Sequence, residues 1–207
     1  MYTLYYSPSS ASMVVHLMLL ELDVPHRLER VDTSRPRDAA YLAMNPQGQV
    51  PTLVVDGRPV TETSALLVLL AERHPEAGLA PLPGSPLRAE YLQWMVALSN
   101  QLMATFRFWF YPGDLGLAEH SAQSRAALQA RIEAIFARID AHLAARGPYL
   151  LGESLSTADL LLVMLMRWSR RMPRTALDWP ALARLASIVR ARPSWQRLYA
   201  VEELVEW

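Results

Sequence analysis

The sequence contains no cysteine and no lysine among its 207 residues. Without cysteine the protein has no thiol nucleophile, no disulfide and no cysteine-ligated metal site, although its redox compartment stays undetermined. Without lysine it cannot form a Schiff base through a lysine side chain. Its basic side chains are therefore all arginines, and these 20 residues balance 20 acidic ones. The net charge gives no reason to expect attraction to nucleic acid or to an anionic membrane.

Long apolar runs are also missing. The purest apolar stretch, Leu160 to Met166, is too short to span a bilayer, and the N-terminus MYTLYYSPSS has neither a basic leader nor a long apolar core. A cytoplasmic protein is therefore the default expectation. A content of 52% hydrophobic and 19% charged residues is that of an ordinary globular chain, long enough for one large or two small domains.

The residue pattern changes once along the chain. Residues 1–77 predict a small α/β layer structure: strands at 1–6 and 26–31, a hairpin around Asp56-Gly57, and helices at 12–22 and 63–74. Residues 78–85 are dense in proline and glycine and predict a linker. Residues 86–207 predict an all-helical domain, with helical spacing at 86–107, 119–146, 156–169, 180–191 and 194–204. We therefore expect two domains, α/β and then all-α.

The helix start in LSTADL is a capping-box pattern. Ser156 can cap the backbone N–H of Asp159, while the Asp159 carboxylate reaches back to the cap residue. A structural cap is the favoured interpretation over a catalytic aspartate.

The stretch NPQGQVPTLVVDG, Asn45 to Gly57, places a proline where a strand should begin. Pro51 cannot donate a ladder hydrogen bond, so it belongs at the first position of that strand. The free backbone groups of Val50 could then pair with an extended peptide by strand addition. Only about 5% of X-Pro bonds are cis, so the residues alone do not predict a cis bond here.

Four segments occur together in a familiar order: LYYSPSSASMVVHLMLLEL, NPQGQVPTLVVDG, VTETSALLVLLAERHP and LLGESLSTADL. In this combination, which covers essentially the whole chain, the sequence resembles the cytosolic glutathione S-transferase family. The resemblance implies a thioredoxin-like N-terminal domain, a C-terminal helical bundle and a cis bond before Pro51. It further implies that the Val50 backbone holds the cysteinyl part of glutathione.

The resemblance also assigns the other glutathione contacts. It places Glu62 where the family receives the γ-glutamyl amine, and a carboxylate facing an ammonium is a charge-assisted pair. Thr63 stands at a helix N-terminus, an anion site suited to the γ-glutamyl carboxylate. Gln49 is a weaker candidate for a further contact. On spacing alone, an ordinary helix start at residues 62–63 is the favoured alternative.

The chemistry is expected in YYSPSSASM. The thiol of glutathione has an unperturbed pKa of roughly 8.5, so little of it is thiolate at neutral pH. One hydroxyl donating a hydrogen bond to the thiolate stabilises it by about 1.5 to 3 kcal/mol, which is roughly one to two pKa units. Resemblance to serine-using branches indicates Ser9; Ser10 is the alternative and Ser12 the expected cap of the first helix. The complete set of candidate donors is Tyr5, Tyr6, Ser9, Ser10 and Ser12.

We expect an electrophile pocket between the domains, where ligand clefts form preferentially. The candidates for its wall are three aromatic residues: Phe106, Trp109 and Trp168. A packed core is the alternative interpretation of such an aromatic stripe. The five histidines show no i, i+3 or i, i+4 pairing, so no metal site is predicted.

The sequence therefore predicts a glutathione S-transferase that uses glutathione as co-substrate against a small hydrophobic electrophile, with a homodimer implied by the resemblance. Two alternatives remain. One is glutathione-dependent reduction of a disulfide or peroxide, which needs no protein cysteine if two glutathiones bind. The other is a non-catalytic binding module on the same scaffold. The natural electrophile is not indicated, because that specificity lies in variable loops and helix ends.

Overall fold

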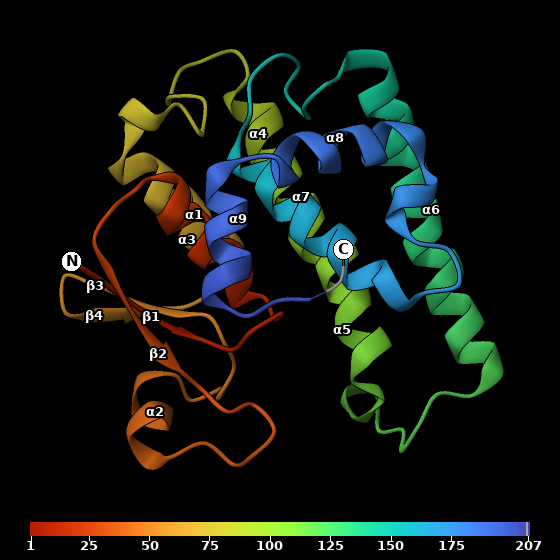
Figure 1. The fold of residues 1–207 in the computed structure, drawn as a ribbon. Coiled ribbons are helices and arrows are strands. Elements are labelled where there is room, and N and C mark those ends of the chain that lie inside the picture. The colour runs from red at the N-terminus through yellow and green to blue at the C-terminus, as the bar shows by residue number, and fades with distance from the viewer. Residues whose placement is uncertain (206) are drawn as a thin grey trace. The chain divides into compact units, whose positions relative to one another are not determined.

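The computed structural model describes residues 1–205 and 207. They fold as two compact units (Figure 1). The first unit comprises Met1–Ala80 together with the C-terminal stretch that begins at Arg190, and the second comprises Pro81–Val189.

The first unit is built on a four-stranded sheet in the order β2-β1-β3-β4. The strands are β1 Tyr2–Tyr6, β2 His26–Arg30, β3 Thr52–Val55 and β4 Arg58–Val60. β2 runs parallel to β1, β3 runs antiparallel to β1, and β4 runs antiparallel to β3. The predicted hairpin is confirmed, because Asp56 and Gly57 join β3 to β4 with positive φ angles of 51° and 78°.

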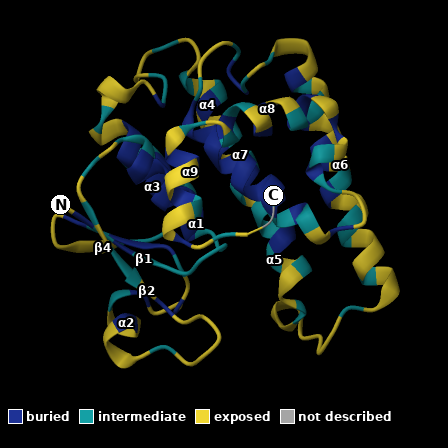
Figure 2. Cartoon of the chain, viewed as in Figure 1, coloured by how far each residue is buried: buried dark blue, intermediate teal, exposed yellow. Residues whose placement is uncertain are grey.

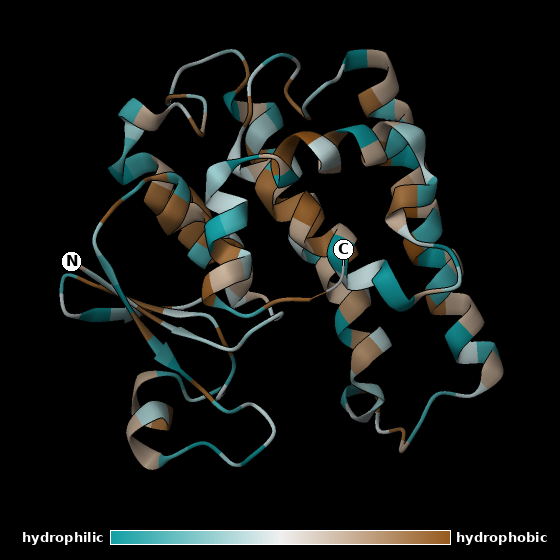
Figure 3. Cartoon of the chain, in the orientation of Figure 1, coloured by the Kyte–Doolittle hydropathy of each residue, from teal (hydrophilic) through white to brown (hydrophobic). Residues whose placement is uncertain are grey.

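The helix α1, Ser12–Glu21, is buried on every side from Ser12 to Leu20. It contacts β1, α3 (Thr63–Arg73) and α9 (Pro193–Val201), which explains why its sequence is apolar all round. Figure 2 shows this helix in the buried colour and Figure 3 shows it as hydrophobic along most of its length. The last helix of the chain therefore completes the core of the first unit.

Two local features of the first unit differ from the sequence-based expectation. A short helix, α2 (Ala39–Met44), begins where the Asp38 carboxylate accepts a hydrogen bond from the Tyr41 backbone N–H at 2.6 Å. The sequence reading missed it, and an aspartate before AAYLAM was its only signal. The expected Ser12 cap was wrong: Ala11 holds the cap position and makes no side-chain bond to α1, because the Ser12 hydroxyl turns back toward the preceding loop.

The second unit is formed by helices, in agreement with the all-helical expectation. They are α4 Arg88–Ala97, α5 Ala104–Phe110, α6 Ala122–Arg146, α7 Thr157–Trp168 and α8 Pro180–Arg190. The single helix predicted at 86–107 is α4 and α5 joined by a π-helical segment, Leu98–Met103. Short 3-10 turns connect other elements at Pro75–Ala77, Pro112–Leu115, Ser169–Arg171 and Ala176–Asp178. α7 is buried from Thr157 to Arg167 and is the central helix of this unit (Figure 2).

The predicted capping box at the start of α7 is confirmed. The Asp159 carboxylate accepts the backbone N–H groups of Ser156 and Leu150, each at 2.8 Å, and the side chain is fully buried. Burial raises the pKa of Asp159 to about 6, against the opposing effect of these hydrogen bonds. Its role is to fix the helix start and the preceding turn.

Candidate functional site

The sheet register brings three of the predicted site segments to one end of the sheet. Tyr5 pairs with Thr52, so the segment that leaves β1 lies beside the one that enters β3. Leu53 pairs with Val60, so the segment that leaves β4 emerges at the same end. These segments carry Ser9, the Val50-Pro51 step, and Glu62 with Thr63, respectively. Strand pairing thereby brings together segments that lie far apart in the sequence, from Ser9 to Thr63.

The peptide bond between Val50 and Pro51 is cis, as the resemblance implied. Pro51 stands immediately before β3, so it removes no ladder donor from the strand. The carbonyl of Gln49 accepts hydrogen bonds from the Tyr41 hydroxyl at 2.5 Å and the Asn45 amide at 2.8 Å. The backbone of Gln49 is therefore held by the protein itself.

Glu62 has a φ of 72°, in the left-handed region that residues other than glycine seldom occupy. Such backbone strain is concentrated at functional sites. Glu62 is exposed, whereas Thr63, the first residue of α3, is only 5% exposed. The geometry thus offers an accessible carboxylate beside a helix N-terminus.

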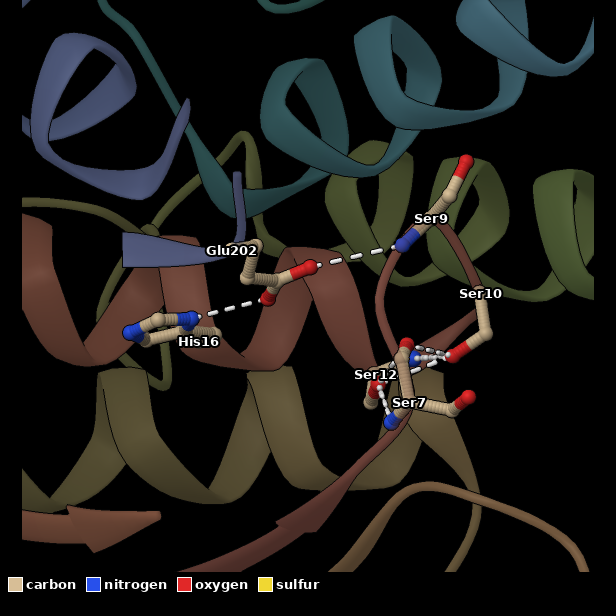
Figure 4. Close-up of polar contacts among 6 residues, drawn as sticks. All are labelled: Ser7, Ser9, Ser10, Ser12, His16 and Glu202. Carbon is tan, nitrogen blue, oxygen red and sulfur yellow. Dashed lines mark hydrogen bonds and ion pairs between the residues drawn. The ribbon is translucent and has the colours of Figure 1, made fainter. Parts of the chain in front are cut away.

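The serines of the Ser9 loop, residues 7–12, differ in whether their side chains bond to one another. The Ser10 hydroxyl donates to the Ser7 carbonyl at 2.7 Å and lies 2.8 Å from the Ser12 hydroxyl. The Ser12 hydroxyl also accepts the Ser7 backbone N–H at 3.1 Å. Figure 4 shows these three serines clustered and the Ser9 hydroxyl directed away from them. Ser9 itself has a strained φ of 62°.

A residue from the far end of the chain also meets this loop. Glu202 follows α9 and is 4% exposed. One oxygen of its carboxylate lies 2.8 Å from His16 Nδ1, and the other accepts the Ser9 backbone N–H at 3.4 Å (Figure 4). His16 is buried and its Nε2 has no partner in the described part of the chain, so the ring most economically carries its hydrogen on Nδ1 and donates it to Glu202. Sequence reasoning missed both residues, which carry no motif.

A second carboxylate fastens the same C-terminal segment to α1. Glu21, at the end of α1, accepts hydrogen bonds from the Arg192 guanidinium, with Nε at 3.0 Å, and from the Ser194 hydroxyl. Burial by itself would raise the pKa of Glu21, but the bonds from Arg192 and Ser194 outweigh it and hold that pKa below its ordinary value. The segment is therefore anchored by one carboxylate at each end.

The two tyrosines of the YYSP segment lie on opposite faces of β1, as successive strand residues must. The Tyr5 ring lies 5.4 Å from the Tyr41 ring, and the Tyr6 ring lies 6.1 Å from the His16 ring, centroid to centroid. They flank the strand that leads into the Ser9 loop.

The three predicted pocket aromatics do not form one wall. Phe106 is fully buried, with its ring 5.8 Å from Trp168 and 5.9 Å from Phe110. Trp109, three residues further along α5, turns instead toward α6, where the Arg125 guanidinium lies 4.3 Å from its ring. Phe110, which the sequence reading omitted, is 45% exposed and lies 6.1 Å from Trp168. The accessible part of this aromatic cluster is therefore Phe110 with Trp168.

Two features are absent from the described residues. No group of three histidine, aspartate or glutamate side chains among them is arranged to hold a metal ion. None of the described helices combines the length and the apolar character needed to cross a membrane.

Comparison with known families agrees with this geometry. The glutathione S-transferase N-terminal domain matches residues 4–78, and the glutathione S-transferase C-terminal domain matches residues 85–193. The chain belongs to the glutathione S-transferase family. The fold agrees as well: the structure of a sphingomonad glutathione S-transferase complexed with glutathione superposes with a TM-score of 0.88 at 28% identity, covering 98% of this chain and all of that one (100%).

Relatives within the family are distant in sequence but similar in length. Glutathione S-transferase GST-4.5 of Xanthomonas campestris pv. campestris is 30% identical over 171 residues, which are 81% of this chain and 82% of the relative. Glutathione S-transferase GstA of Escherichia coli O157:H7 is 26% identical over 97% of this chain and 98% of its own length. The family assignment thus extends over both units.

Proposed function

We propose that this family member binds glutathione at the sheet end described above and transfers it to a small hydrophobic electrophile. The observation that carries the proposal is the convergence of the cis Val50-Pro51 step, Glu62 with Thr63, and the Ser9 loop at one end of one sheet. Extended glutathione would pair with the Val50 backbone by strand addition. Its γ-glutamyl amine would meet Glu62, and its γ-glutamyl carboxylate the N-terminus of α3 at Thr63.

The proposed chemistry is stabilisation of the glutathione thiolate by the Ser9 hydroxyl. The thiol releases its proton to solvent, the sulfur lone pair forms a bond to an electrophilic carbon, and the bond to the leaving group breaks where there is one. The position of the Ser9 loop at the N-terminus of α1 favours negative charge there. Ser10 is less suited to this role, since its hydroxyl donates to the Ser7 carbonyl.

The remaining parts of the proposal rest on the family assignment. The exposed Phe110 and the partly buried Trp168, which pack beside Phe106, are proposed to contact the electrophile, with Trp109 as an additional contact. The active form is proposed to be a cytoplasmic homodimer, and glutathione the only small-molecule co-substrate required.

A titration of the glutathione complex tests the proposal. The ultraviolet thiolate band would be followed against pH in the wild type, in Ser9→Ala and in Ser10→Ala. We expect the wild type to hold the bound thiol pKa below the free value, and Ser9→Ala to raise it by about one to two units. Ser10→Ala serves as the matched control and should change it less.

Each other outcome has a definite meaning. Tight binding without a thiolate band would contradict transferase chemistry and favour a carrier. A shift in Ser10→Ala instead of Ser9→Ala would move the donor role to Ser10. A wild type that binds no glutathione would refute the proposed site.

A further inference from the structure

A closed ring of hydrogen bonds includes a backbone carbonyl of the Val50 loop, residues 45–51. The Gln49 carbonyl accepts from the Tyr41 hydroxyl and from the Asn45 amide, at 2.5 and 2.8 Å. The Asn45 amide also lies 3.0 Å from the Thr52 hydroxyl, which lies 2.9 Å from the Tyr41 hydroxyl. Four groups thus form one cycle.

The hydrogens in this cycle can be assigned by counting. Tyr41 has a single hydroxyl hydrogen and gives it to Gln49, so the Thr52 hydroxyl donates to Tyr41. Asn45 has two amide hydrogens, one for the Gln49 carbonyl and one for the Thr52 hydroxyl. Its amide oxygen accepts the Gln47 backbone N–H at 3.2 Å, which fixes the orientation of the amide.

All three side chains of the cycle are buried: Tyr41 and Asn45 are each 4% exposed, and Thr52 is fully buried. Hydrogen bonds away from water are stronger, and networks with every member satisfied hold their groups in a single arrangement. The cycle therefore restrains the chain more than isolated surface hydrogen bonds would.

The cycle holds the chain by hydrogen bonds on both sides of the Val50-Pro51 step, at Gln49 and at Thr52. Gln49 directly precedes Val50, and Thr52 directly follows Pro51. Building on the proposed function, we propose that Tyr41, Asn45 and Thr52 are positioning residues that hold the Val50 backbone in register for glutathione. None of them needs to touch the ligand, because they act through the main chain between residues 49 and 52.

The second unit supplies a matched control for this proposal. There the Tyr91 hydroxyl lies 2.7 Å from the Thr157 hydroxyl, in a pair that is also buried. Tyr91→Phe and Tyr41→Phe therefore remove the same kind of buried Tyr–Thr contact, one within the second unit and one beside the Val50-Pro51 step of the first unit. Any effect of lost stability alone should be common to both variants.

The experiment measures glutathione affinity by calorimetry, the midpoint of thermal unfolding, and the bound thiol pKa. We expect Tyr41→Phe to weaken glutathione binding about three- to tenfold, the size expected for losing the hydrogen bond that holds the Gln49 carbonyl. Its bound thiol pKa should stay at the wild-type value, because the Ser9 loop is untouched. In steady state, KM for glutathione should rise while kcat at saturating glutathione is retained.

A graded variant guards against a simple folding defect. Thr52→Val removes the two hydrogen bonds that the Thr52 hydroxyl makes, but it leaves both donors on the Gln49 carbonyl, so its loss of affinity should be smaller than that of Tyr41→Phe. Wild-type affinity in Tyr41→Phe, or an equal loss in Tyr91→Phe, would overturn the inference. A wild type that binds no glutathione would instead overturn the proposed function, and this inference with it.

Discussion

The Ser9 loop and the Val50 loop lie at the same end of the sheet but are held in different ways. Every side chain that holds the Val50 loop comes from nearby in the sequence: Tyr41 and Thr52 are 11 positions apart. The Ser9 loop receives a contact from Glu202, 193 positions away from Ser9. One loop is defined by a local segment, whereas the other is complete only when the C-terminal segment has packed on α1.

Under the proposed function, this difference separates two tasks within one site. Glutathione affinity should depend mainly on local structure around Val50, and thiol activation should depend on the docking of α9. A defect near the C-terminus would then impair chemistry before it impairs binding.

Removing the long-range contact should have the largest effect. Glu202→Ala removes the acceptor of the buried His16 ring and the carboxylate contact to the backbone of Ser9, and it leaves a cavity. We expect the free energy of unfolding to fall by roughly 3 to 5 kcal/mol. With Ser9 released from its strained φ, the bound thiol pKa should rise toward the free value, while glutathione affinity changes less. Denaturant unfolding and the thiolate titration measure these effects.

The control for Glu202 is Glu21, the carboxylate that holds the start of α9 on α1. Glu21→Ala also weakens the docking of α9, through Arg192 and Ser194, but it leaves the Ser9 loop untouched. If both variants raised the thiol pKa equally, docking in general and not the Glu202 contact would be responsible. Glu202→Gln provides the conservative variant should the alanine form fail to fold.

The buried carboxylate of Asp159 is held by groups close to it in the sequence, at Ser156 and Leu150. Its effect can be followed in the free energy of unfolding as a function of pH. Its folded pKa of about 6 lies above the ordinary value of 3.8, so between these values the native state binds more protons than the unfolded state. Stability conferred by the protonated form is fully present below the lower value and is lost as the pH rises through the upper one. The free energy of unfolding should therefore fall by about 2 kcal/mol between pH 4 and 6 through this group.

Other carboxylates oppose this trend, since the pKa values of Glu21 and Asp32 are lowered in the folded state. The comparison must therefore be made as a difference between wild type and Asp159→Asn, measured by denaturant unfolding at several pH values. The difference should carry the slope described above. A difference that does not change between pH 4 and 6 would show that burial does not raise this pKa.

The same distinction between local and long-range contacts explains which features could be predicted from the sequence. The strands, the hairpin at Asp56-Gly57 and the capping box at Ser156 and Asp159 are encoded by neighbouring residues, and all were predicted. The cis bond before Pro51 required a family resemblance, because the base rate of such bonds is low. Local patterns therefore predicted the fold class, whereas the glutathione segments were assigned by the family resemblance.

Features that depend on tertiary contacts were not predictable in this way. Nothing near Glu202 in the sequence signals His16 or Ser9, because that contact exists only after α9 packs on α1. The Ser12 cap was wrong for a related reason: loop contacts with Ser7 and Ser10 compete for the same hydroxyl. Helical spacing also could not show that Trp109 would turn to Arg125, away from Phe106.

The smallest effect should come from changing the third segment while leaving both loops intact. Glu62→Gln replaces the charge-assisted pair proposed for the γ-glutamyl amine with a neutral hydrogen bond, so glutathione affinity should fall a few-fold, corresponding to about 1 kcal/mol. Glu29→Gln, which removes the same charge from an exposed ion pair with Arg27 on β2, is the matched control. Calorimetry should show weaker binding only in Glu62→Gln, with an unchanged bound thiol pKa. A raised thiol pKa in Glu62→Gln would contradict the division, because it would make this carboxylate part of thiol activation as well as of binding.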